Sequence, residues 1–575
     1  MVKKEIRIIN SPRDTIEIRL PDHRILSGPR GKTLLDYLKV LPEWQFPPIV
    51  GAVVDGDLRE LTFTLEKDSD VKPVTMVDSD GSKIYRRSLT FLLEAAFENL
   101  FPSDYLIVDY SVPSGGYFCR LLNRAPLSGD ELARLDDRMH EMVDANIPVI
   151  REKVTVDEAS RYFKQKKYLD KVRLLKYRKK PFLILYRLEN HRDYHHGYMV
   201  PSTELLKWFN LILQPEGFLL QYPRRKTPTE LFQMPEYSKL LEEFKSYGDW
   251  LTKLNIDSVG ALNESIENKN INEVILVSEA HHDQKLVQIA KEIADRIGEI
   301  KIILIAGPSS SGKTTFSKRL AIQLLTQGVS PFALEMDNYF VDREMTPRDS
   351  EGNLDFESFD AIDHHLMQNQ LEEIIAGKKV TLPFYNFKTG KSEVGESIQL
   401  MKDQIVIIEG IHGLNPNLLP NINERSTFKI YISCLTQLNL DRYNRISTTD
   451  TRMLRRIVRD ANTRGYTAQR TIQMWESVRR GERQHIFPHQ ENANVLFNSA
   501  LVYELSALKP FAEPLLRQIP HGTDEYLEAK RLLSILEWFL PVQAELVPDN
   551  SILREFIGGS ILKDFRLWKN VHEAL

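Results

Sequence analysis

The sequence predicts a multidomain protein that combines α/β and α+β folds, and three observations lead to this expectation. First, 575 residues are enough for about three to five domains of roughly 100–200 residues each. Second, short alternating strands broken by Pro, Asp and Gly turns fill residues 1–67, which predicts a small β-rich module. Third, residues 285–500 alternate apolar runs with helical patterns, as expected for a parallel sheet flanked by helices.

The N-terminal elements follow from local periodicity. Strands are expected at residues 5–9 and 15–20, where apolar and polar side chains alternate. Helices are expected at 89–100 and 128–145, where apolar residues recur every three or four positions. Together with interspersed strands, these helices predict an α+β domain over residues 68–205.

Two further segments complete the expected organisation. Prolines and the cluster Arg-Arg-Lys-Thr-Pro mark residues 206–284 as a connector, with a helix from about 235 to 255. Residues 501–575 are expected to form a C-terminal helical extension. Within it, the Gly-Gly turn in residues 551–560 predicts a structural role, and no chemistry is assigned to this segment.

A strand, a loop and a helix are expected in succession at residues 302–324. The apolar run 302–306 is typical of a buried parallel strand, and the loop after it fits G-x-x-x-x-G-K-[ST] at every position. Such a loop cradles phosphates with its backbone N–H groups, and Lys313 would reach the β- and γ-phosphates. The alternative is a Gly/Ser turn that only caps a helix. The predicted nucleotide contacts are Gly307, Pro308, Ser309, Ser310, Ser311, Gly312, Lys313, Thr314 and Thr315.

Carboxylates follow two more apolar strands. Asp337 comes directly after residues 331–336, and Glu409 comes directly after residues 404–408. In open parallel sheets, ligands bind at the carboxyl ends of the strands, so Asp337 is a candidate general base. Its alternative role is to cap the next helix. Glu409 and the hydroxyl of Thr314 are the expected ligands of Mg²⁺.

Five arginines occur within residues 451–465. Arg452, Arg456 and Arg459 have the spacing i, i+4, i+7, which places them along one helix face. Like charges in this arrangement repel one another, so we expect a lid helix that closes over the nucleotide phosphates. The alternative is a surface helix whose arginines pair with acids such as Asp460.

Composition excludes several classes of protein. No stretch approaches the roughly 18 consecutive apolar residues of a membrane span, and the first residues lack the apolar core of a secretion signal, so a cytoplasmic location is expected. Two cysteines are too few for a disulfide framework or a thiolate metal site, and both are expected to be buried. A net charge of −4 argues against general coating of nucleic acid.

Residues 161–180 form a local exception in charge. Ten basic residues and four aromatic residues lie in this run, with Asp170 as the only acid. Basic side chains beside aromatic rings suit phosphate contacts and base stacking, so RNA or tRNA is a possible partner of the N-terminal half. The alternative is a solvated helix face and a strand edge protected by lysines.

Six ordered motifs lie between residues 300 and 500. Together they resemble the uridine kinase and phosphoribulokinase branch of the P-loop kinases. The motifs are residues 307–314, 336–340, 354–360, 382–387, 408–411 and 450–460.

This resemblance implies a kinase with ATP and Mg²⁺ as cofactors. It identifies Asp337 as the catalytic base, with Lys313 and Arg459 as further catalytic residues. It places Arg464, together with Arg459, in the lid that binds the phosphates.

The resemblance also implies where the acceptor binds. Asp355 and Arg456 would hold the ribose hydroxyls, and Tyr385 would lie at the nucleobase. Uridine–cytidine kinases have a histidine after the P-x-Y-D-F motif to recognise the pyrimidine edge, whereas this chain has Gly390. Loss of this directional donor weakens the case for pyrimidine specificity.

Residues 1–205 resemble a different family. Motifs at residues 86–88, 101–102, 146–152 and 200–203 are similar to the first two domains of threonyl-tRNA synthetase. The resemblance implies a TGS-type β-grasp domain over residues 1–67, followed by the α+β domain that removes amino acids from mischarged tRNA.

Three of the four polar residues of that editing site are replaced by side chains unsuitable for its chemistry. The histidine pair of the family falls on Arg87 and Phe91, and its later cysteine and histidine fall on His195 and Met199. A phenyl ring and a thioether cannot transfer protons, so no editing activity is expected. His195 and His196 are candidate metal ligands, but two adjacent histidines without a further cluster are weak evidence for a metal site.

The combination resembles bacterial nucleoside kinases that carry synthetase-like N-terminal domains. The expected reaction transfers the γ-phosphoryl group of ATP to the 5′-hydroxyl of a nucleoside, uridine being the leading candidate. Two alternatives stay open: a kinase of another small hydroxylated substrate such as a sugar phosphate, and an RNA-associated ATP-binding switch. An oligomer is compatible with each of these, and no membrane partner is expected.

Overall fold

The computed structural model describes residues 13–234, 237–349, 352–401 and 404–565. The predicted strand at residues 5–9 lies outside these ranges. The chain divides into two compact units, which are described separately below. Unit 1 comprises Met1–Pro235, Arg442–Asn444 and Pro520–Arg531, and unit 2 comprises Glu236–Asp441, Arg445–Ile519 and Leu532–Leu575.

The first sheet of unit 1 has five strands in the order β2-β1-β5-β3-β4. Its buried face is formed by alternate apolar residues, such as Ile16 and Ile18, that pack against Leu34 and Leu38 of a short helix. This mixed sheet with one covering helix confirms the β-rich module that the alternating sequence predicts. The elements are β1 (Thr15–Arg19), β2 (Ile25–Pro29), α1 (Leu34–Leu38), β3 (Ile49–Val54), β4 (Asp57–Arg59) and β5 (Ser69–Thr75).

The next region packs two helices against a four-stranded antiparallel sheet with the order β11-β12-β7-β6. The second helix occurs where the periodicity predicts it, and Ser128 caps it with its hydroxyl. The first helix ends at Leu100 as predicted but begins at Ser79, ten residues before the predicted start at 89. The hairpin of β11 and β12 lies within the segment predicted as a connector. The elements are α2 (Ser79–Leu100), β6 (Tyr105–Val112), β7 (Gly116–Leu122), α3 (Gly129–Asp144), β11 (Asn210–Gln214) and β12 (Gly217–Gln221).

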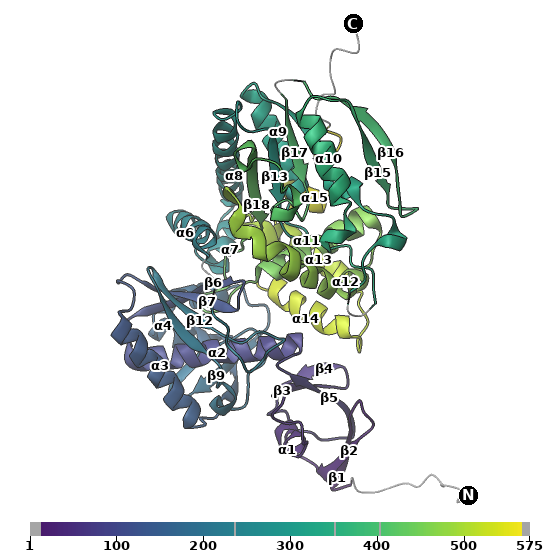
Figure 1. The fold of residues 1–575 in the computed structure, drawn as a ribbon. Helices are drawn as coiled ribbons and strands as arrows, with labels where there is room; N and C mark the ends of the chain where they lie inside the picture. Colours follow the sequence, from purple (N-terminus) through teal and green to yellow (C-terminus); the bar gives the residue numbers. More distant parts are fainter. Residues whose placement is uncertain (1–12, 235–236, 350–351, 402–403, 566–575) are drawn as a thin grey trace, which may run out of the picture. The chain divides into compact units, whose positions relative to one another are not determined.

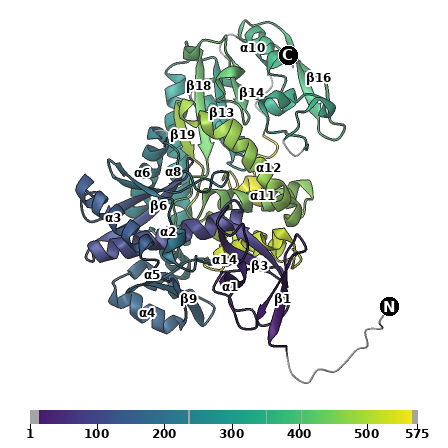
Figure 2. The same cartoon turned by 60° about the horizontal axis from the view of Figure 1, so that its bottom comes forward.

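A separate three-stranded sheet in unit 1 has the order β10-β9-β8. Helix α4 packs against β8, β9 and α5 (Figure 2). The elements are β8 (Ile150–Thr155), α4 (Val156–Gln165), α5 (Leu169–Leu175), β9 (Phe182–Leu188) and β10 (His191–Tyr194).

Unit 2 is built on a parallel five-stranded sheet with the order β14-β17-β13-β18-β19. Helix α9 contacts β13, β14 and β17 (Figure 1). Met367 and Leu371 of α10 belong to the same buried apolar cluster as Ile302 and Leu304 of β13. The strands are β13 (Ile302–Ala306), β14 (Ser330–Glu335), β17 (Gln404–Glu409), β18 (Thr427–Ser433) and β19 (Val495–Asn498). This arrangement confirms the predicted α/β fold.

The other elements of unit 2 surround this sheet or extend from it. Strands β15 (Val380–Asn386) and β16 (Lys391–Ile398) form an antiparallel hairpin. The helices are α6 (Ser238–Lys253), α7 (Val259–Glu267), α8 (Ile271–Ala294), α9 (Lys313–Thr326), α10 (His364–Ile375), α11 (Thr448–Arg464), α12 (Ala468–Gly481), α13 (Glu504–Leu516) and α15 (Arg554–Ile557). Helix α14 (Asp524–Leu536) belongs to both units: residues 524–531 are part of unit 1, and the rest is part of unit 2.

Two expectations from composition can be compared with the structure. Cys119 and Cys434 are buried and not disulfide-bonded, as expected for small apolar side chains. Within the described ranges, no helix combines the length and the apolar character needed to cross a membrane.

Candidate active site

The loop between β13 and α9 has the backbone shape of a phosphate-binding loop. Gly312 precedes the helix at φ +89°, in the left-handed region that favours glycine. A Cβ atom on Gly307 would lie 2.1 Å from the carbonyl oxygen of Ile432 in the neighbouring strand β18, so this position also requires glycine. The first N–H groups of α9 have no partner within the helix and can bind an anion.

Lys313 is the first residue of α9, and its ammonium group folds back onto the loop. It donates hydrogen bonds to the carbonyl oxygens of Gly307 at 2.9 Å and Pro308 at 3.3 Å. Burial lowers the pKa of Lys313, while the carboxylates of Glu409 and Asp337 oppose this effect. The side chain is therefore within electrostatic reach of Asp337, the predicted base, and of Glu409, a predicted ligand of Mg²⁺.

Thr314 and Glu409 lie together at the carboxyl end of the sheet. The Thr314 hydroxyl donates to Oε1 of Glu409 at 2.8 Å. Oε2 of Glu409 is buried and has no hydrogen-bond partner among the described residues. A hydroxyl and a carboxylate with one unpartnered oxygen fit the oxygen ligands that Mg²⁺ prefers. Burial raises the pKa of Glu409 to about 7, although Lys313 acts in the opposite direction. The positive charge near Glu409 is therefore too small to offset the cost of burying its carboxylate.

Asp337 lies just beyond β14, in a turn of 3₁₀-helix at Met336–Tyr339. Its side chain is exposed to solvent, yet the surrounding protein raises its pKa by desolvation, against the opposing charges of Lys313 and Arg464. Asp337 lies inside this 3₁₀-helix and does not cap it, because the N-cap residue is Glu335. The register of β14 and β17 pairs Glu335 with Glu409, so Asp337 and Glu409 extend from the same sheet edge.

Asp355 and Glu357 lie in the segment after the 3₁₀-helix. Oδ1 of Asp355 accepts the N–H of Glu357 at 3.1 Å. Burial raises the pKa of Glu357 to about 7, and the nearby carboxylate of Glu482 adds to the increase. Arg456 and Lys313 act in the opposite direction, so this acidic pair lies within range of the cationic part of the site.

Three arginines of α11 share one buried carboxylate. Asp460 is fully buried and pairs with Arg456, Arg459 and Arg464 at 3.2–3.3 Å. Burial and the neighbouring charge of Arg464 lower the pKa of Arg459. Acid pairing, the alternative expected from the sequence, is therefore present, but one carboxylate balances only one of three positive charges. The remaining charge can be neutralised by phosphate.

The same helix also holds the phosphate-binding loop. Arg452 donates to the carbonyl oxygen of Ser309 at 2.9 Å and pairs with Glu482, and Arg456 donates to the Ser309 hydroxyl at 2.8 Å. Glu482 in turn accepts the N–H of Ser309 at 3.0 Å. Arg452 therefore supports the loop and is not available as a phosphate ligand in this state.

The C-terminal segment contacts the other end of the loop. Oε2 of Glu555 accepts the N–H of Thr315 at 3.2 Å and its hydroxyl at 2.9 Å. Ile552 lies so close to Gly312 that a Cβ atom there would be 2.6 Å from its side chain. Lys318 donates to the carbonyl oxygen of Leu562 at 2.7 Å. This segment thus packs along the start of α9, a role that its sequence does not indicate.

Aromatic rings gather at the β15–β16 hairpin. Tyr385 is buried, and its ring lies 5.5 Å from that of Phe340 and 4.9 Å from that of Phe387, centroid to centroid. Its hydroxyl has no hydrogen-bond partner among the described residues. Phe387 is 60% exposed, so this cluster offers an apolar surface to a planar ligand.

Arg343 occupies the space beside Gly390. A Cβ atom on Gly390 would lie 2.7 Å from the guanidinium carbon of Arg343, and Gly390 has φ +72°. The guanidinium group donates to the carbonyl oxygen of Phe387 at 2.7 Å. The position where a pyrimidine-reading histidine is expected therefore contains a glycine that makes room for an arginine from another loop.

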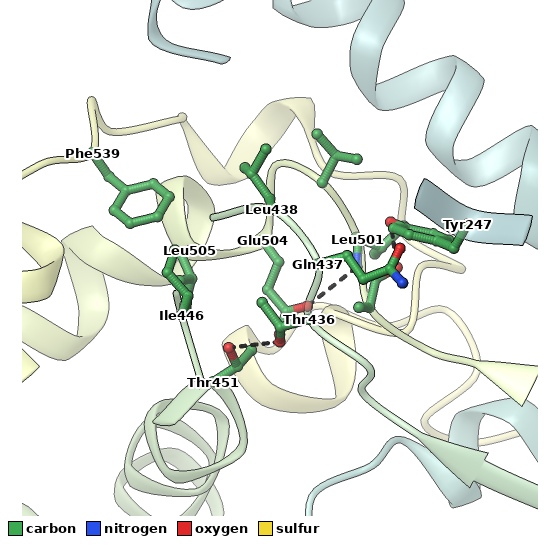
Figure 3. A pocket seen from close by; sticks show the side chains of 12 residues that line it. Tyr247, Thr436, Gln437, Leu438, Ile446, Thr451, Leu501, Glu504, Leu505 and Phe539 are labelled. Atoms are coloured by element: carbon green, nitrogen blue, oxygen red, sulfur yellow. Dashed lines mark hydrogen bonds between the residues drawn. The ribbon is translucent and has the colours of Figure 1, made fainter. Parts of the chain in front are cut away.

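A small cavity of about 20 Å³ lies elsewhere in unit 2 (Figure 3). Thr451 and Thr436 hydrogen-bond to one another at its wall, at 2.9 Å. Its size admits about one water molecule, so it cannot hold a nucleoside. Its lining consists of Tyr247, Thr436, Gln437, Leu438, Ile446, Thr451, Ala500, Leu501, Val502, Glu504, Leu505 and Phe539.

The positions of the lost editing residues in unit 1 have new contacts. Arg87 donates to the carbonyl oxygen of Tyr198 at 2.7 Å. Phe91 is fully buried and packs against the rings of His191 and His195, each with a centroid distance of 5.4 Å. Met199 is buried as well. These side chains fill the region with packing contacts in place of proton-transferring groups.

The basic run of residues 161–180 does not form one solvated face. Lys171 is 2% exposed and pairs with Asp193 at 2.8 Å, and Lys166 pairs with Glu98. Lys167, Lys179 and Lys180 are exposed. Only part of the run is therefore available for contact with RNA.

Three acidic residues near the loop have no role in the sequence-based prediction. Glu357, Glu482 and Glu555 follow no apolar strand, and each reaches the site through tertiary packing. Glu357 falls inside a kinase-like motif, which was the one available signal. Lys313, Thr314, Glu409 and Asp337 extend from the same edge of the sheet, as their positions after the strands predict.

Comparison with known proteins separates the two parts of the chain. Residues 302–506 match the model of the Phosphoribulokinase / Uridine kinase family. A uridine kinase from Ureaplasma parvum is 27% identical over 195 residues, which cover 34% of this chain and 86% of that protein. A solved structure described as a possible uridine kinase from Bacillus stearothermophilus is 22% identical, covers 36% of this chain and all of that chain, and has a TM-score of 0.24.

The other match concerns tRNA ligases. A threonine–tRNA ligase from Symbiobacterium thermophilum is 28% identical over 198 residues, which cover 34% of this chain. The chain spans about 30% of the length of that relative. Residues 302–506 therefore form a domain of the phosphoribulokinase / uridine kinase family, in a chain that also contains a part similar to threonine–tRNA ligases.

Proposed function

We propose that this protein transfers the γ-phosphoryl group of ATP to the 5′-hydroxyl of a nucleoside, with uridine as the leading acceptor. The observation that carries the proposal is the convergence of four groups at one sheet edge. Lys313, Thr314 and Glu409 lie around the phosphate-binding loop, and Asp337 extends from the adjacent strand end. Phosphoryl transfer requires this set: a cation, a metal-binding pair and a group that orients the attacking hydroxyl.

ATP phosphates are bound by backbone N–H groups at the start of α9 and by cationic side chains. Lys313 exchanges its two carbonyl contacts for phosphate oxygens. Arg459 and Arg464 supply positive charge that Asp460 alone does not balance. Arg456 is positioned between the lid and the loop by its bonds to Asp460 and Ser309.

Thr314 and Glu409 would hold Mg²⁺, which neutralises charge on the phosphate oxygens during transfer. The unpartnered Oε2 of Glu409 supports this assignment. Asp337 accepts the proton of the attacking hydroxyl. Its carboxylate is exposed to solvent and does not cap its own 3₁₀-helix, so it is accessible to a substrate.

A second group of residues holds the acceptor. Asp355 and Arg456 bind the ribose hydroxyls, and both interact electrostatically with Glu357. Tyr385 and the aromatic residues around it provide the surface on which the base packs. This group of residues favours a kinase over an ATP-binding switch, because hydrolysis alone requires no ligands for an acceptor.

A second acceptor class is favoured by Arg343. Its guanidinium group lies beside Gly390, at the position where a donor to a pyrimidine is expected. An arginine suits a phosphate or carboxylate as well as a base edge. A phosphorylated sugar is therefore the alternative acceptor, and RNA contact through the exposed basic residues of unit 1 remains a further proposal.

An acceptor panel tests these assignments. The purified chain is supplied with Mg²⁺ and ATP, and ADP release is measured with nucleosides, phosphorylated sugars and RNA in turn. Uridine-stimulated ADP release together with formation of the 5′-monophosphate supports the first proposal. Stimulation only by a sugar phosphate supports the second, and stimulation only by RNA without a phosphorylated product supports the switch. An Arg343→Ala variant should alter the ranking of acceptors while leaving ATP binding unchanged.

A further inference from the structure

A cluster of potential metal ligands lies inside unit 1. Strand β10 and the residue beyond it present His191, Asp193 and His195 at every second position, which places their side chains on one side of the strand. Glu94 faces them from helix α2. Phe91, one turn earlier on α2, packs against both imidazole rings and fixes their positions.

The four side chains are removed from solvent. The exposed fractions are 0% for Glu94 and Asp193, 3% for His191 and 2% for His195. Burial at this level is costly for charged groups unless each is paired or coordinates a metal. Yet Oε1 of Glu94 and Oδ2 of Asp193 have no hydrogen-bond partner among the described residues.

The spacing of the donor atoms suits one small cation. Nε2 of His191 and Nε2 of His195 lie 3.3 and 3.2 Å from the same oxygen of Glu94. Ligands about 2.0–2.1 Å from a tetrahedral zinc ion are separated by roughly 3.3 Å. Donor atoms of Glu94, His191 and Asp193 also lie within 4.8 Å of one another, and a shared ion would draw them closer. His195 is linked to the same group through Oε2 of Glu94.

Charged residues next to these donors orient them. Nδ1 of His191 pairs with Glu98, which leaves Nε2 directed toward Glu94. Lys171 pairs with Oδ1 of Asp193 at 2.8 Å and leaves Oδ2 unpartnered. A carboxylate on the far nitrogen of a histidine is the usual support of a metal-bound imidazole.

We propose that Glu94, His191, Asp193 and His195 form a zinc site with a structural role. Two imidazole nitrogens and two carboxylate oxygens favour Zn²⁺ over Mg²⁺ or Ca²⁺, which prefer oxygen ligands alone. Four protein ligands and almost complete burial leave no open position for substrate, as in structural zinc sites. The ion joins α2 to β10 where the resembled editing site has lost its polar groups. His196, the other histidine that the sequence offers, is not a ligand.

Zinc content and thermal unfolding of the full chain test this proposal. The protein is stripped with a chelator, dialysed against Zn²⁺ or Mg²⁺, and analysed for bound metal and for Tm. We expect one zinc ion per chain above the amount bound by His191→Ala, and a higher Tm with Zn²⁺ than with Mg²⁺. His196→Ala is the matched control and should retain the zinc. Glu98→Gln should still bind it, with affinity lowered about 10–100-fold, as expected for a supporting residue.

Two results would overturn the site. One is equal zinc content in the unchanged chain and His191→Ala, and the other is a Tm of the unchanged chain that Zn²⁺ does not raise. The second measurement needs no variant, so it remains decisive if His191→Ala fails to fold. Either result would identify the cluster as a network of buried ion pairs.

Discussion

The carboxylate of Glu555 accepts hydrogen bonds from both the backbone N–H and the hydroxyl of Thr315, at 3.2 and 2.9 Å. Thr315 lies in the first turn of α9, where unpaired N–H groups are directed at the expected phosphates. A carboxylate at this position takes the bonds that a phosphate oxygen would accept. We therefore propose that Glu555 competes with ATP for Thr315.

Removal of this negative charge should strengthen ATP binding. In Glu555→Gln, the competing interaction loses its charge, and hydrogen bonds to charged groups contribute about 1.5–3 kcal/mol. We expect the Kd for ATP to fall about tenfold, as measured by calorimetry with Mg²⁺ present. Glu545→Gln, an exposed change in the same C-terminal region, should leave the Kd unchanged. A higher Kd in Glu555→Gln would instead make Glu555 a support of the nucleotide site.

Asp337→Asn separates proton transfer from nucleotide binding. The amide keeps the shape of the side chain but cannot accept the proton, so phosphorylation should fall about 10²–10⁴-fold while ATP still binds. Single-turnover assays together with ATP titration measure the two effects. Asp360→Asn changes an exposed aspartate nearby and should retain full activity. Loss of ATP binding with unchanged chemistry would show that Asp337 holds the metal or the fold.

The pH profile should report the environment of Asp337. A base acts only when unprotonated, so activity falls as the pH drops through its pKa. This loss of activity forms the acidic limb of the pH profile. Because desolvation raises the pKa of Asp337, the midpoint of the limb is expected above about pH 3.9, the ordinary pKa of an aspartate.

Arg464 lowers the pKa of Asp337, so Arg464→Gln should move the acidic limb of kcat/KM to higher pH. The midpoint of the limb distinguishes this effect from a general loss of activity. Arg470→Gln, an exposed change at the start of α12, should leave the midpoint in place. An acidic limb that does not move would exclude Asp337 as the titrating base.

Unit 1 should not release amino acids from mischarged threonine tRNA. Arg87 is engaged with the carbonyl oxygen of Tyr198, and Phe91 and Met199 are buried, so the region lacks proton-transferring groups at the required positions. Deacylation measured with the purified chain should proceed at the uncatalysed rate. Deacylation that persists in a Lys313→Ala protein would show that this part retains hydrolytic chemistry.

Site residues that directly follow a strand could be predicted from the sequence. Asp337 and Glu409 each follow a short apolar run, and the parallel sheet then brings the two ends to one edge. The spacing of Arg452, Arg456 and Arg459 is likewise enough to predict the helix that carries them. Their separate partners were not predictable, because Glu482 and the loop around Ser309 meet the helix only in the folded chain.

Other features depend on packing between distant segments. Glu555 is 240 residues away from Thr315 in the sequence, and no local pattern connects them. Pro215 suggests a connector, but it lies in the two-residue turn between β11 and β12, a position that suits proline. The alternation of His191, Asp193 and His195 was visible in the sequence, whereas Glu94, which completes the cluster, is supplied by a helix about 100 residues earlier. The boundaries between the five predicted domains and segments stay a prediction.

The decisive measurement is transfer of the terminal phosphoryl group from ATP to a nucleoside. It compares the unchanged chain with Lys313→Ala. Lys313 is the cation matched to the transferred group, so its loss should lower turnover about 10²-fold or more. Circular dichroism of the variant verifies that it is folded. The unchanged chain should form nucleoside 5′-monophosphate, and Lys313→Ala should form almost none. Equal turnover in a folded Lys313→Ala protein would show that the phosphate-binding loop does not carry out this transfer.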